Sequence, residues 1–270
     1  MATAEDTRTR VALITGGARG IGLAIAKGLA LQGTVVYLAD ITRDIGQVPY
    51  PLAREADLAR AEADLRRLQP RCRGLPCDVR DPADVHRVVS AIEAAEGRLD
   101  ILVNNAAVLV LHPLEAVSDA EWAAQFDTIA TGAFLCCRRA LPAMRAGGWG
   151  RIVNIASVAG HRGIGTGVAY SAAKHALVGL TRALAMEVAG AGITVNAVCP
   201  GTVVTDLVLG TGAAQGWTAE ETLARLSERH LGGGPVSPDD VAAAALWLAS
   251  EAAGRVTGAS LFVDDGWHAH

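Results

Sequence analysis

Short runs of apolar and β-branched residues alternate along the whole chain with longer segments of helical period. The runs expected to form strands are residues 10–15, 34–39, 73–77, 100–104, 151–156, 193–199 and 259–263. Segments rich in Ala and Leu lie between them, and helices are expected at 83–95, 120–145, 169–189 and 238–250, among others. Strands that alternate with helices form a parallel sheet covered on both faces. The pattern therefore predicts an α/β fold with a doubly wound parallel sheet of about seven strands.

No Pro- or Ser-rich linker and no internal repeat interrupts this alternation, so residues 1–270 are expected to form a single domain. Two connections are longer than usual. Residues 41–58 carry Pro49-Tyr50-Pro51 and are expected to be a loop, and residues 207–234 are rich in Gly and Thr around a short helical patch at 219–230. Long loops in compact domains are often binding loops, and a substrate loop is expected at about 203–234.

Composition excludes several classes of function. The 24 basic and 28 acidic residues are scattered and leave a net charge of −4, which argues against nucleic acid or an anionic membrane as the main partner. The 5 cysteines form no CxxC pair, so neither a disulfide framework nor a metal site is expected. No run is long and apolar enough to span a membrane, and residues 1–10 do not read as a signal peptide, so the protein is expected to be cytoplasmic.

A glycine-rich turn directly follows the first expected strand. It reads Thr15-Gly16-Gly17-Ala18-Arg19-Gly20-Ile21-Gly22 and leads into a helical segment at 23–31. Glycine accepts positive φ and has no Cβ, so backbone N–H groups of such a turn can approach a pyrophosphate closely. The helix N-terminus directs its partial positive charge at the same anion. Between a strand and a helix, this turn predicts a dinucleotide site.

Asp40 stands at the end of the second strand, after this turn. A carboxylate there can accept hydrogen bonds from the adenosine ribose hydroxyls and would repel the 2′-phosphate of NADP. Arg19 and Arg43 are nearby cations that soften this preference. NAD is the cofactor that the sequence favours.

Tyr170 and Lys174 stand four residues apart in an expected helix, so their side chains project from one face. A free phenol has a pKa near 10, and an adjacent cation is expected to lower it toward the range of a useful base. Ser157 follows the fifth strand, where its hydroxyl can hold a substrate oxygen. This trio predicts acid–base chemistry at a carbinol or carbonyl carbon, with Tyr170 as the general acid/base.

Together the motifs resemble those of the short-chain dehydrogenase/reductase family, in its compact single-domain branch. The resemblance rests on TGxxxGIG, Asn104-Asn105-Ala106-Ala107, a Ser thirteen residues before YxxxK, and Pro200-Gly201 with Thr205, all in order from about Arg10 to Gly266. It implies a Rossmann-like fold, a nicotinamide cofactor and hydride transfer. It also implies a homotetramer, with 120–145 and 169–189 at one dimer contact.

The resemblance assigns roles residue by residue. Ser157, Tyr170 and Lys174 match the catalytic residues of the family, and Tyr170 and Lys174 also contact the cofactor. Asp78 matches the acid that contacts adenine, and Thr205 matches the hydroxyl near the carboxamide. The implied cofactor-binding residues are Gly16, Arg19, Gly20, Ile21, Gly22, Asp40, Asp78, Val79, Asn105, Ala106, Pro200, Gly201, Val203 and Thr205.

The sequence departs from the family pattern in two places. Ile129 occupies the position of the family's fourth catalytic residue, an Asn thought to stabilise a helix kink whose backbone carbonyl holds a water. Thr128 or Thr131 could stand in for that side chain, and activity is expected. The loop after Asp40 resembles the insertion of carveol-type and mycofactocin-associated members, in which NAD is held tightly and exchanges poorly; the alternative is a surface loop with no effect on exchange.

Mainly apolar residues are expected to face the substrate, among them Ala107, Leu109, His161, Ile164, Val203, Leu207 and Trp217. They favour a small, largely apolar secondary alcohol or ketone. The alternatives are a 3-oxoacyl-type or sugar/polyol NAD(P)-dependent reductase, and a non-catalytic NAD-binding regulator, which Ile129 alone favours.

Overall fold

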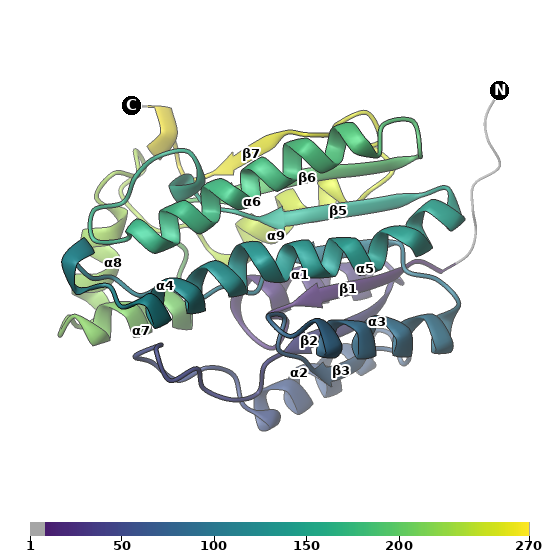
Figure 1. Cartoon of the computed structure of the whole chain (residues 1–270), viewed down its shortest axis with the longest axis horizontal. Helices are drawn as coiled ribbons and strands as arrows, with labels where there is room; N and C mark the ends of the chain where they lie inside the picture. Colours follow the sequence, from purple (N-terminus) through teal and green to yellow (C-terminus); the bar gives the residue numbers. More distant parts are fainter. Residues whose placement is uncertain (1–8, 270) are drawn as a thin grey trace.

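The computed structural model describes residues 9–269 of the chain. Strands lie side by side in one parallel sheet of order β3-β2-β1-β4-β5-β6-β7 (Figure 1). Their bounds are β1 Val11–Thr15, β2 Val35–Asp40, β3 Arg73–Pro76, β4 Ile101–Asn104, β5 Gly150–Ile155, β6 Ile193–Pro200 and β7 Ser260–Val263. The predicted Rossmann-like sheet is confirmed, with each strand within a residue or so of its expected bounds. The sequence predicts that residues 1–10 are not a signal peptide. Residues 1–8 of that segment lie outside the described residues.

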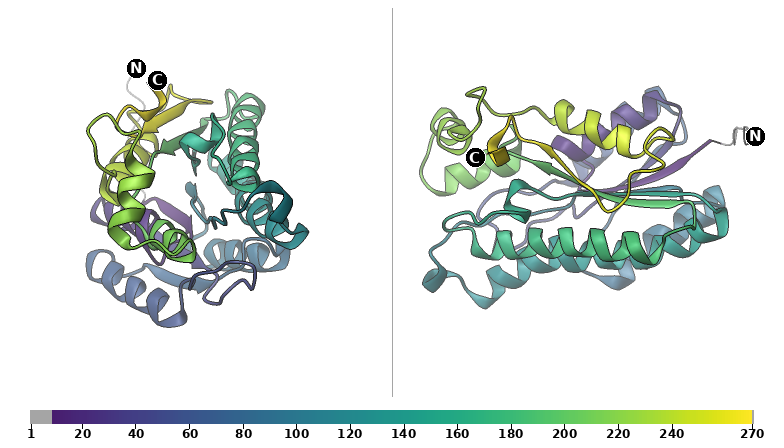
Figure 2. Two further views of the ribbon diagram at one scale, coloured as in Figure 1. Left: turned by 90° about the vertical axis from the view of Figure 1, so that its left-hand side faces the viewer. Right: turned by 90° about the horizontal axis from the view of Figure 1, so that it is seen from above.

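Helices cover both faces of this sheet, as the two views of Figure 2 show. On one face α1 packs against α2 and α9, and on the other α3 packs against α5, with α4 against α6. The helices are α1 Gly20–Leu31, α2 Glu55–Leu68, α3 Pro82–Glu96, α4 Asp119–Phe126, α5 Gly132–Gly147, α6 Val168–Glu187, α7 Asp206–Ala214, α8 Ala219–Ser227 and α9 Pro238–Leu248. Short turns of 3₁₀ helix lie at Leu114–Ala116, Val158–Gly160 and Trp267–Ala269.

Side chains alternate between the two faces along each strand, and so each strand contributes to an apolar core on either side of the sheet. In β1, Ala12 and Ile14 face a cluster built with α1, α2 and α9. Their neighbours Val11 and Leu13 face a second cluster built with α3, α5 and α6. Because successive strand residues point to opposite faces, a strand buried on both sides must be apolar throughout, as β1 is.

The helix predicted as one segment at 120–145 is interrupted. α4 ends at Phe126, a π-helical turn occupies Asp127–Thr131, and α5 begins at Gly132. Within this region the Thr128 hydroxyl donates a 2.7 Å hydrogen bond to the Ala124 carbonyl. Hydrophobic periodicity does not predict such a turn, because the extra residue that a π-helical turn inserts leaves the apolar repeat of each flanking helix unchanged.

The two long connections are more ordered than predicted. The first is a loop only as far as Arg54, because the Arg54 N–H donates to the Asp57 carboxylate and so begins α2 within the segment expected to be irregular. The second contains α7 as well as the expected α8; the Thr205 and Thr218 hydroxyls cap these helices. The sequence did not predict α7, because the segment contains glycines and glycine is a poor helix former. No helix among residues 9–269 is long and apolar enough to cross a membrane.

Candidate active site

At the carboxyl ends of the central strands, α7, α8 and the loop after β2 gather (Figures 1 and 2). A pocket at this end is lined by residues at or just after the ends of β1, β2, β4, β5 and β6. Strand order reverses at β1, which pairs with β2 on one side and β4 on the other. Ligands of open α/β sheets bind at such a reversal. Of the residues singled out from the sequence, those that line the pocket are Gly16, Arg19, Gly20, Ile21, Asp40, Asp78, Val79, Asn105, Ala106, Ala107, Thr128, Ser157, Tyr170, Lys174, Pro200, Gly201, Val203, Thr205 and Leu207.

The glycine-rich turn has the geometry of an anion cradle. Gly16 and Gly20 adopt positive φ values of 62° and 53°. A Cβ on Gly22 would lie 2.3 Å from the Gly16 carbonyl oxygen, so Gly22 lets α1 start close against the turn instead of lining the pocket. The Arg19 side chain, at the N-cap position of α1, makes no capping hydrogen bond. The first N–H groups of α1 therefore remain suited to the phosphate oxygens of a dinucleotide.

Asn105 and Thr15 hold this turn against β4. The Asn105 amide donates to the carbonyls of Thr15 and Gly16 at 3.0 and 2.9 Å. The Thr15 hydroxyl accepts from the N–H groups of Asn105 and Ala106 at 3.0 and 3.1 Å. The Asn105 side chain thus positions the cradle, and Asn105 is among the residues that line the pocket.

Asp40 reaches the pocket from the end of β2. Its carboxylate accepts hydrogen bonds from the backbone N–H groups of Ala18 and Ile41, both at 2.9 Å. Burial raises the pKa of the Asp40 carboxyl, and these two hydrogen bonds and the charge of Arg19 oppose that rise. The bonds fix the carboxylate beside the glycine-rich turn, where a dinucleotide would present its adenosine ribose.

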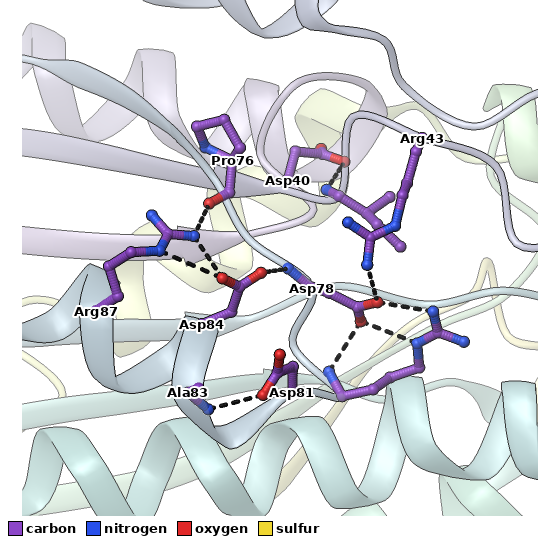
Figure 3. A network of polar contacts seen from close by, with 10 residues as sticks. Asp40, Arg43, Pro76, Asp78, Asp81, Ala83, Asp84 and Arg87 are labelled. Carbon is purple, nitrogen blue, oxygen red and sulfur yellow. Dashed lines mark hydrogen bonds and ion pairs between the residues drawn. The ribbon is translucent and has the colours of Figure 1, made fainter.

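Asp78 is engaged more heavily than the sequence implied (Figure 3). Arg80 donates to both carboxylate oxygens at 2.9 and 2.7 Å, and Arg43 donates to one of them at 3.0 Å. Burial acts to raise the pKa of the Asp78 carboxyl, but Arg80 and Arg43 together hold it below its usual value. The Asp78 N–H donates to Asp84 at 2.9 Å. The loop after β2 is therefore tied through Arg43 to the end of β3.

Ser157, Tyr170 and Lys174 come together in the pocket. The Ser157 hydroxyl lies close enough to the Tyr170 phenol to act on its pKa. The Lys174 ammonium donates a 2.7 Å hydrogen bond to the carbonyl of Ile155 and lies 5.5 Å from the centre of the Tyr170 ring. As the spacing predicted, the phenol and the amine lie on one face of α6.

Burial controls the protonation of this group. It raises the pKa of the Tyr170 phenol, an effect that the nearby Ser157 hydroxyl only partly offsets. Burial also lowers the pKa of Lys174 to about 7. The lowering of the phenol pKa expected from Lys174 is therefore outweighed here, and Tyr170 is a neutral phenol at neutral pH.

Ile129 lies within the π-helical turn and is buried in a cluster with Tyr170 and Leu109. A π-helical turn is thus present at this position without the family's Asn side chain. Of the two threonines considered as substitutes, Thr128 lines the pocket. Thr131 instead donates to Asp127 at 3.1 Å and is absent from the pocket lining.

The residues named for the substrate side separate into two groups. Ala107, Val203 and Leu207 line the pocket, whereas His161 and Ile164 do not. The His161 ring packs 5.0 Å from that of Phe262. Ile164 and Leu109 belong to the apolar cluster around Tyr170. Trp217 packs against Arg225, with 5.1 Å from the guanidinium carbon to the ring centre.

The sequence argument linked the loop after β2 to retention of NAD but named none of its residues as pocket lining. Ile41, Ile45, Leu52 and Ala53 line the pocket, and Asp206 and Val208 join Leu207 from α7. The available signal was the number of apolar residues in a stretch expected to be an exposed loop. Among residues 9–269 no group of three or more His, Cys, Asp or Glu side chains is placed to hold a metal ion.

Comparison with known proteins agrees with this geometry. A family model described as enoyl-(acyl carrier protein) reductase matches residues 16–268. The chain is 37% identical over 258 residues to D-threitol dehydrogenase of Mycolicibacterium smegmatis, covering 96% of this chain and 92% of that protein. Carveol dehydrogenase from Mycobacterium avium in complex with NAD superposes with a TM-score of 0.92 at 33% identity, covering 98% of this chain and 99% of the other. A variant of actinorhodin polyketide ketoreductase with NADPH gives a TM-score of 0.88 at 35% identity, covering 100% of both chains.

Proposed function

This chain belongs to the short-chain dehydrogenase/reductase family, and from that premise we propose that it is an NAD-dependent dehydrogenase or ketone reductase acting on small, largely apolar secondary alcohols. The observation that carries the proposal is that Ser157, Tyr170 and buried Lys174 line one pocket, which continues to the glycine-rich turn and Asp40. Acid–base groups at one end and an anion cradle at the other suit hydride exchange with a dinucleotide.

Tyr170 is the proton donor and acceptor. In ketone reduction its neutral phenol gives a proton to the carbonyl oxygen while the carbon receives a hydride, and in alcohol oxidation both move in the opposite direction. Ser157 holds the substrate oxygen through its hydroxyl, which lies beside the Tyr170 phenol in the pocket. Bound NAD would supply the hydride acceptor, or in its reduced form the donor.

Lys174 supports this exchange from beside the phenol, with its amine 5.5 Å from the centre of the Tyr170 ring. Its hydrogen bond to the Ile155 carbonyl fixes the amine in place. The low pKa, about 7, means that the amine changes protonation near neutrality and can pass a proton onward from Tyr170. Thr128, in the π-helical turn, also lines the pocket, and its hydroxyl donates to the Ala124 carbonyl.

NAD rather than NADP is proposed as the cofactor. The residues to hold it are the turn at Gly16, Arg19, Gly20 and Ile21, with Gly22 behind it, then Asp40, Asp78, Val79, Asn105 and Ala106, and on the nicotinamide side Tyr170, Lys174, Pro200, Gly201, Val203 and Thr205. The Asp40 carboxylate supports NAD, because a 2′-phosphate beside it would meet a like charge. Arg43, the cation that could favour NADP, is paired with Asp78 at 3.0 Å.

The substrate side of the pocket supports an apolar alcohol. Ala107, Val108, Leu207 and Val208 supply apolar lining there. Residues 203–234, with α7 and α8, are proposed as the substrate loop. We retain Ala107 and Leu207 as substrate contacts; His161 and Ile164 would have to act from behind the lining.

Measuring absorbance at the NADH band with NAD or NADP and a panel of secondary alcohols tests the proposal. Tyr170→Phe should lower turnover at least about a hundredfold while leaving NAD affinity unchanged. Tyr37→Phe is the matched control, since Tyr37 is buried in β2 and its hydroxyl contacts Glu96 at 3.1 Å. Turnover that survives in Tyr170→Phe would refute the assigned role.

A non-catalytic NAD-binding regulator remains the second candidate, favoured by Ile129 alone. Such a protein would bind NAD and show no turnover in either the wild type or the Tyr170→Phe variant. A 3-oxoacyl-type or polyol reductase would instead be revealed by its substrate in the same panel.

A homotetramer in the cytoplasm is also proposed. Trp122 and Phe126 stack on α4 with ring centres 5.9 Å apart, and Trp122 and Phe134 are 40% and 44% exposed. Apolar side chains exposed on α4 and α5 suit a contact between copies of the chain. The five cysteines are free and buried, as suits a reducing compartment. Light scattering coupled to size-exclusion chromatography measures the assembly.

A further inference from the structure

We propose that Tyr50, in the loop after β2, is a positioning residue that fixes the substrate-side wall of the pocket against α7, so that this loop helps to select the substrate. The inference deepens the proposed function and rests on it. Tyr50 lies outside the residues that line the pocket, and its action would be exerted through its neighbours.

The wall in question is the segment 108–111, which follows β4 and is buried throughout. Its backbone groups are held by side chains. The Leu109 N–H donates to the Tyr50 hydroxyl at 2.9 Å, and the Val110 N–H donates to the Gln125 side chain at 3.0 Å. Gln215 donates to the Leu111 carbonyl at 3.0 Å. Since buried backbone groups need partners, the position of this segment depends on these side chains.

The segment stands between the loop and the reactive phenol. Val108 lines the pocket and packs in a cluster with Tyr50, Ile45 and Leu52. Leu109 and Leu111 pack in the neighbouring cluster that contains Tyr170. A shift of this wall therefore changes the space available to a substrate beside Tyr170, without touching the dinucleotide cradle.

Tyr50 also engages α7. Its hydroxyl lies close enough to the Thr211 side chain for Thr211 to act on the Tyr50 pKa. A Cβ on Gly210 would lie 2.7 Å from Cβ and Cγ of Tyr50, so the absence of a side chain at Gly210 is what lets the ring lie against the helix. Thr211 in turn donates to the carbonyls of Leu207 and Leu109 at 2.7 and 3.3 Å. One phenol thus joins the loop, the wall and the helix that carries Leu207.

Tyr50→Phe removes only the hydroxyl and leaves the buried Leu109 N–H without that acceptor. We expect KM for the preferred alcohol to rise about tenfold, with kcat and the NADH dissociation constant within about twofold of the wild type. We also expect the kcat/KM values for compact and for bulky alcohols to become more nearly equal. Gly210→Ala, which displaces the ring instead of removing the hydroxyl, should shift KM in the same direction.

Tyr37→Phe is the matched control, because it removes a hydroxyl from another buried tyrosine, remote from the wall. It should leave KM and the preference unchanged. A fall in kcat at constant KM in Tyr50→Phe would overturn the proposal, because that result would mark a role in the chemical step. An unchanged KM together with an unchanged preference between compact and bulky alcohols in Tyr50→Phe would also overturn the proposal.

Amide hydrogen exchange provides a readout that does not need turnover. In Tyr50→Phe, peptides covering 105–112 and 206–215 should exchange faster than in the wild type, whereas Tyr37→Phe should leave both unchanged. If the wild type oxidised no alcohol in the panel, the proposed function would fail, and exchange would still decide the role of Tyr50. Unaltered exchange in both segments would overturn it.

Discussion

The Arg19 guanidinium and the Asp206 carboxylate form an ion pair, with 3.1 Å between nitrogen and oxygen. The pair joins the glycine-rich turn to the first residue of α7. A second nitrogen of the same guanidinium donates to the Pro51 carbonyl at 3.3 Å. One side chain therefore connects the turn, the loop after β2 and α7 across the mouth of the pocket. The two side chains of the pair are 31% and 59% exposed, so their attraction is weak and sensitive to salt.

Asp206→Asn should accelerate release of NADH with little loss of stability. The substitution removes one charge of the pair and retains a polar group at the start of α7. We expect the dissociation rate, measured by stopped-flow NADH fluorescence, to rise about two- to fivefold. Added salt should raise the rate in the wild type and much less in the variant. A rate that is equal in both proteins at low salt would show that this ion pair does not hold the pocket closed.

Lys174 should make stability depend on pH. Burial lowers its pKa from 10.5 to about 7. Below pH 7 both the folded and the unfolded chain carry the proton, and the folded state bears the full cost of burying the charge. Between the two values the unfolded chain binds more protons, so the contribution of Lys174 to the free energy of unfolding becomes less unfavourable as pH rises through this window.

Lys174→Met should therefore stabilise the nucleotide-free protein near pH 6 by about 1 kcal/mol or more, and the gain should diminish toward pH 10. Urea unfolding at several pH values measures this. The control is Lys27→Met, since Lys27 is the only other lysine in the chain and is exposed on α1. Parallel pH profiles for wild type and Lys174→Met would contradict the lowered pKa.

Asp40→Asn should weaken the preference for NAD over NADP. The amide oxygen can still accept the hydrogen bond from Ala18, so the turn should keep its shape while the negative charge is lost. We expect kcat/KM with NADP to rise about tenfold relative to that with NAD. Asp119→Asn, an equal change of charge at an exposed position on α4, should leave the ratio unchanged. An unchanged ratio in Asp40→Asn would remove the basis for proposing NAD.

Gly22→Ala should destabilise the protein and impair dinucleotide binding together. The added Cβ would lie 2.3 Å from the Gly16 carbonyl oxygen and 2.6 Å from the Asn105 amide nitrogen, so the turn must move away from α1. We expect a loss of about 1 to 3 kcal/mol in unfolding free energy, measured with urea, and weaker NADH binding by fluorescence titration. Gly147→Ala, at an exposed end of α5 with open space around it, should be neutral or slightly stabilising. Unimpaired NADH binding in Gly22→Ala would show that the turn is not the cradle.

The predictable parts of the site are those set by neighbours in the sequence. Tyr170 and Lys174 face the same way because a helix brings residues four apart onto one face. Asp40 meets the glycine-rich turn because β2 lies beside β1 in a parallel sheet. His161 and Ile164 illustrate the opposite case. Both lie on the loop expected to face a substrate, yet their packing against Phe262 and within the Tyr170 cluster keeps them out of the pocket lining.

By itself the sequence determined the parallel sheet, the order of its elements and the local motifs, because hydrophobic period and glycine placement act over a few residues. Only the tertiary structure decided the π-helical turn around Ile129, the pairing of Asp78 with Arg43 and the contact of Tyr50 with Leu109. The last two join residues 35 and 59 positions apart. Their geometry depends on how whole helices and loops pack, which no short-range pattern encodes.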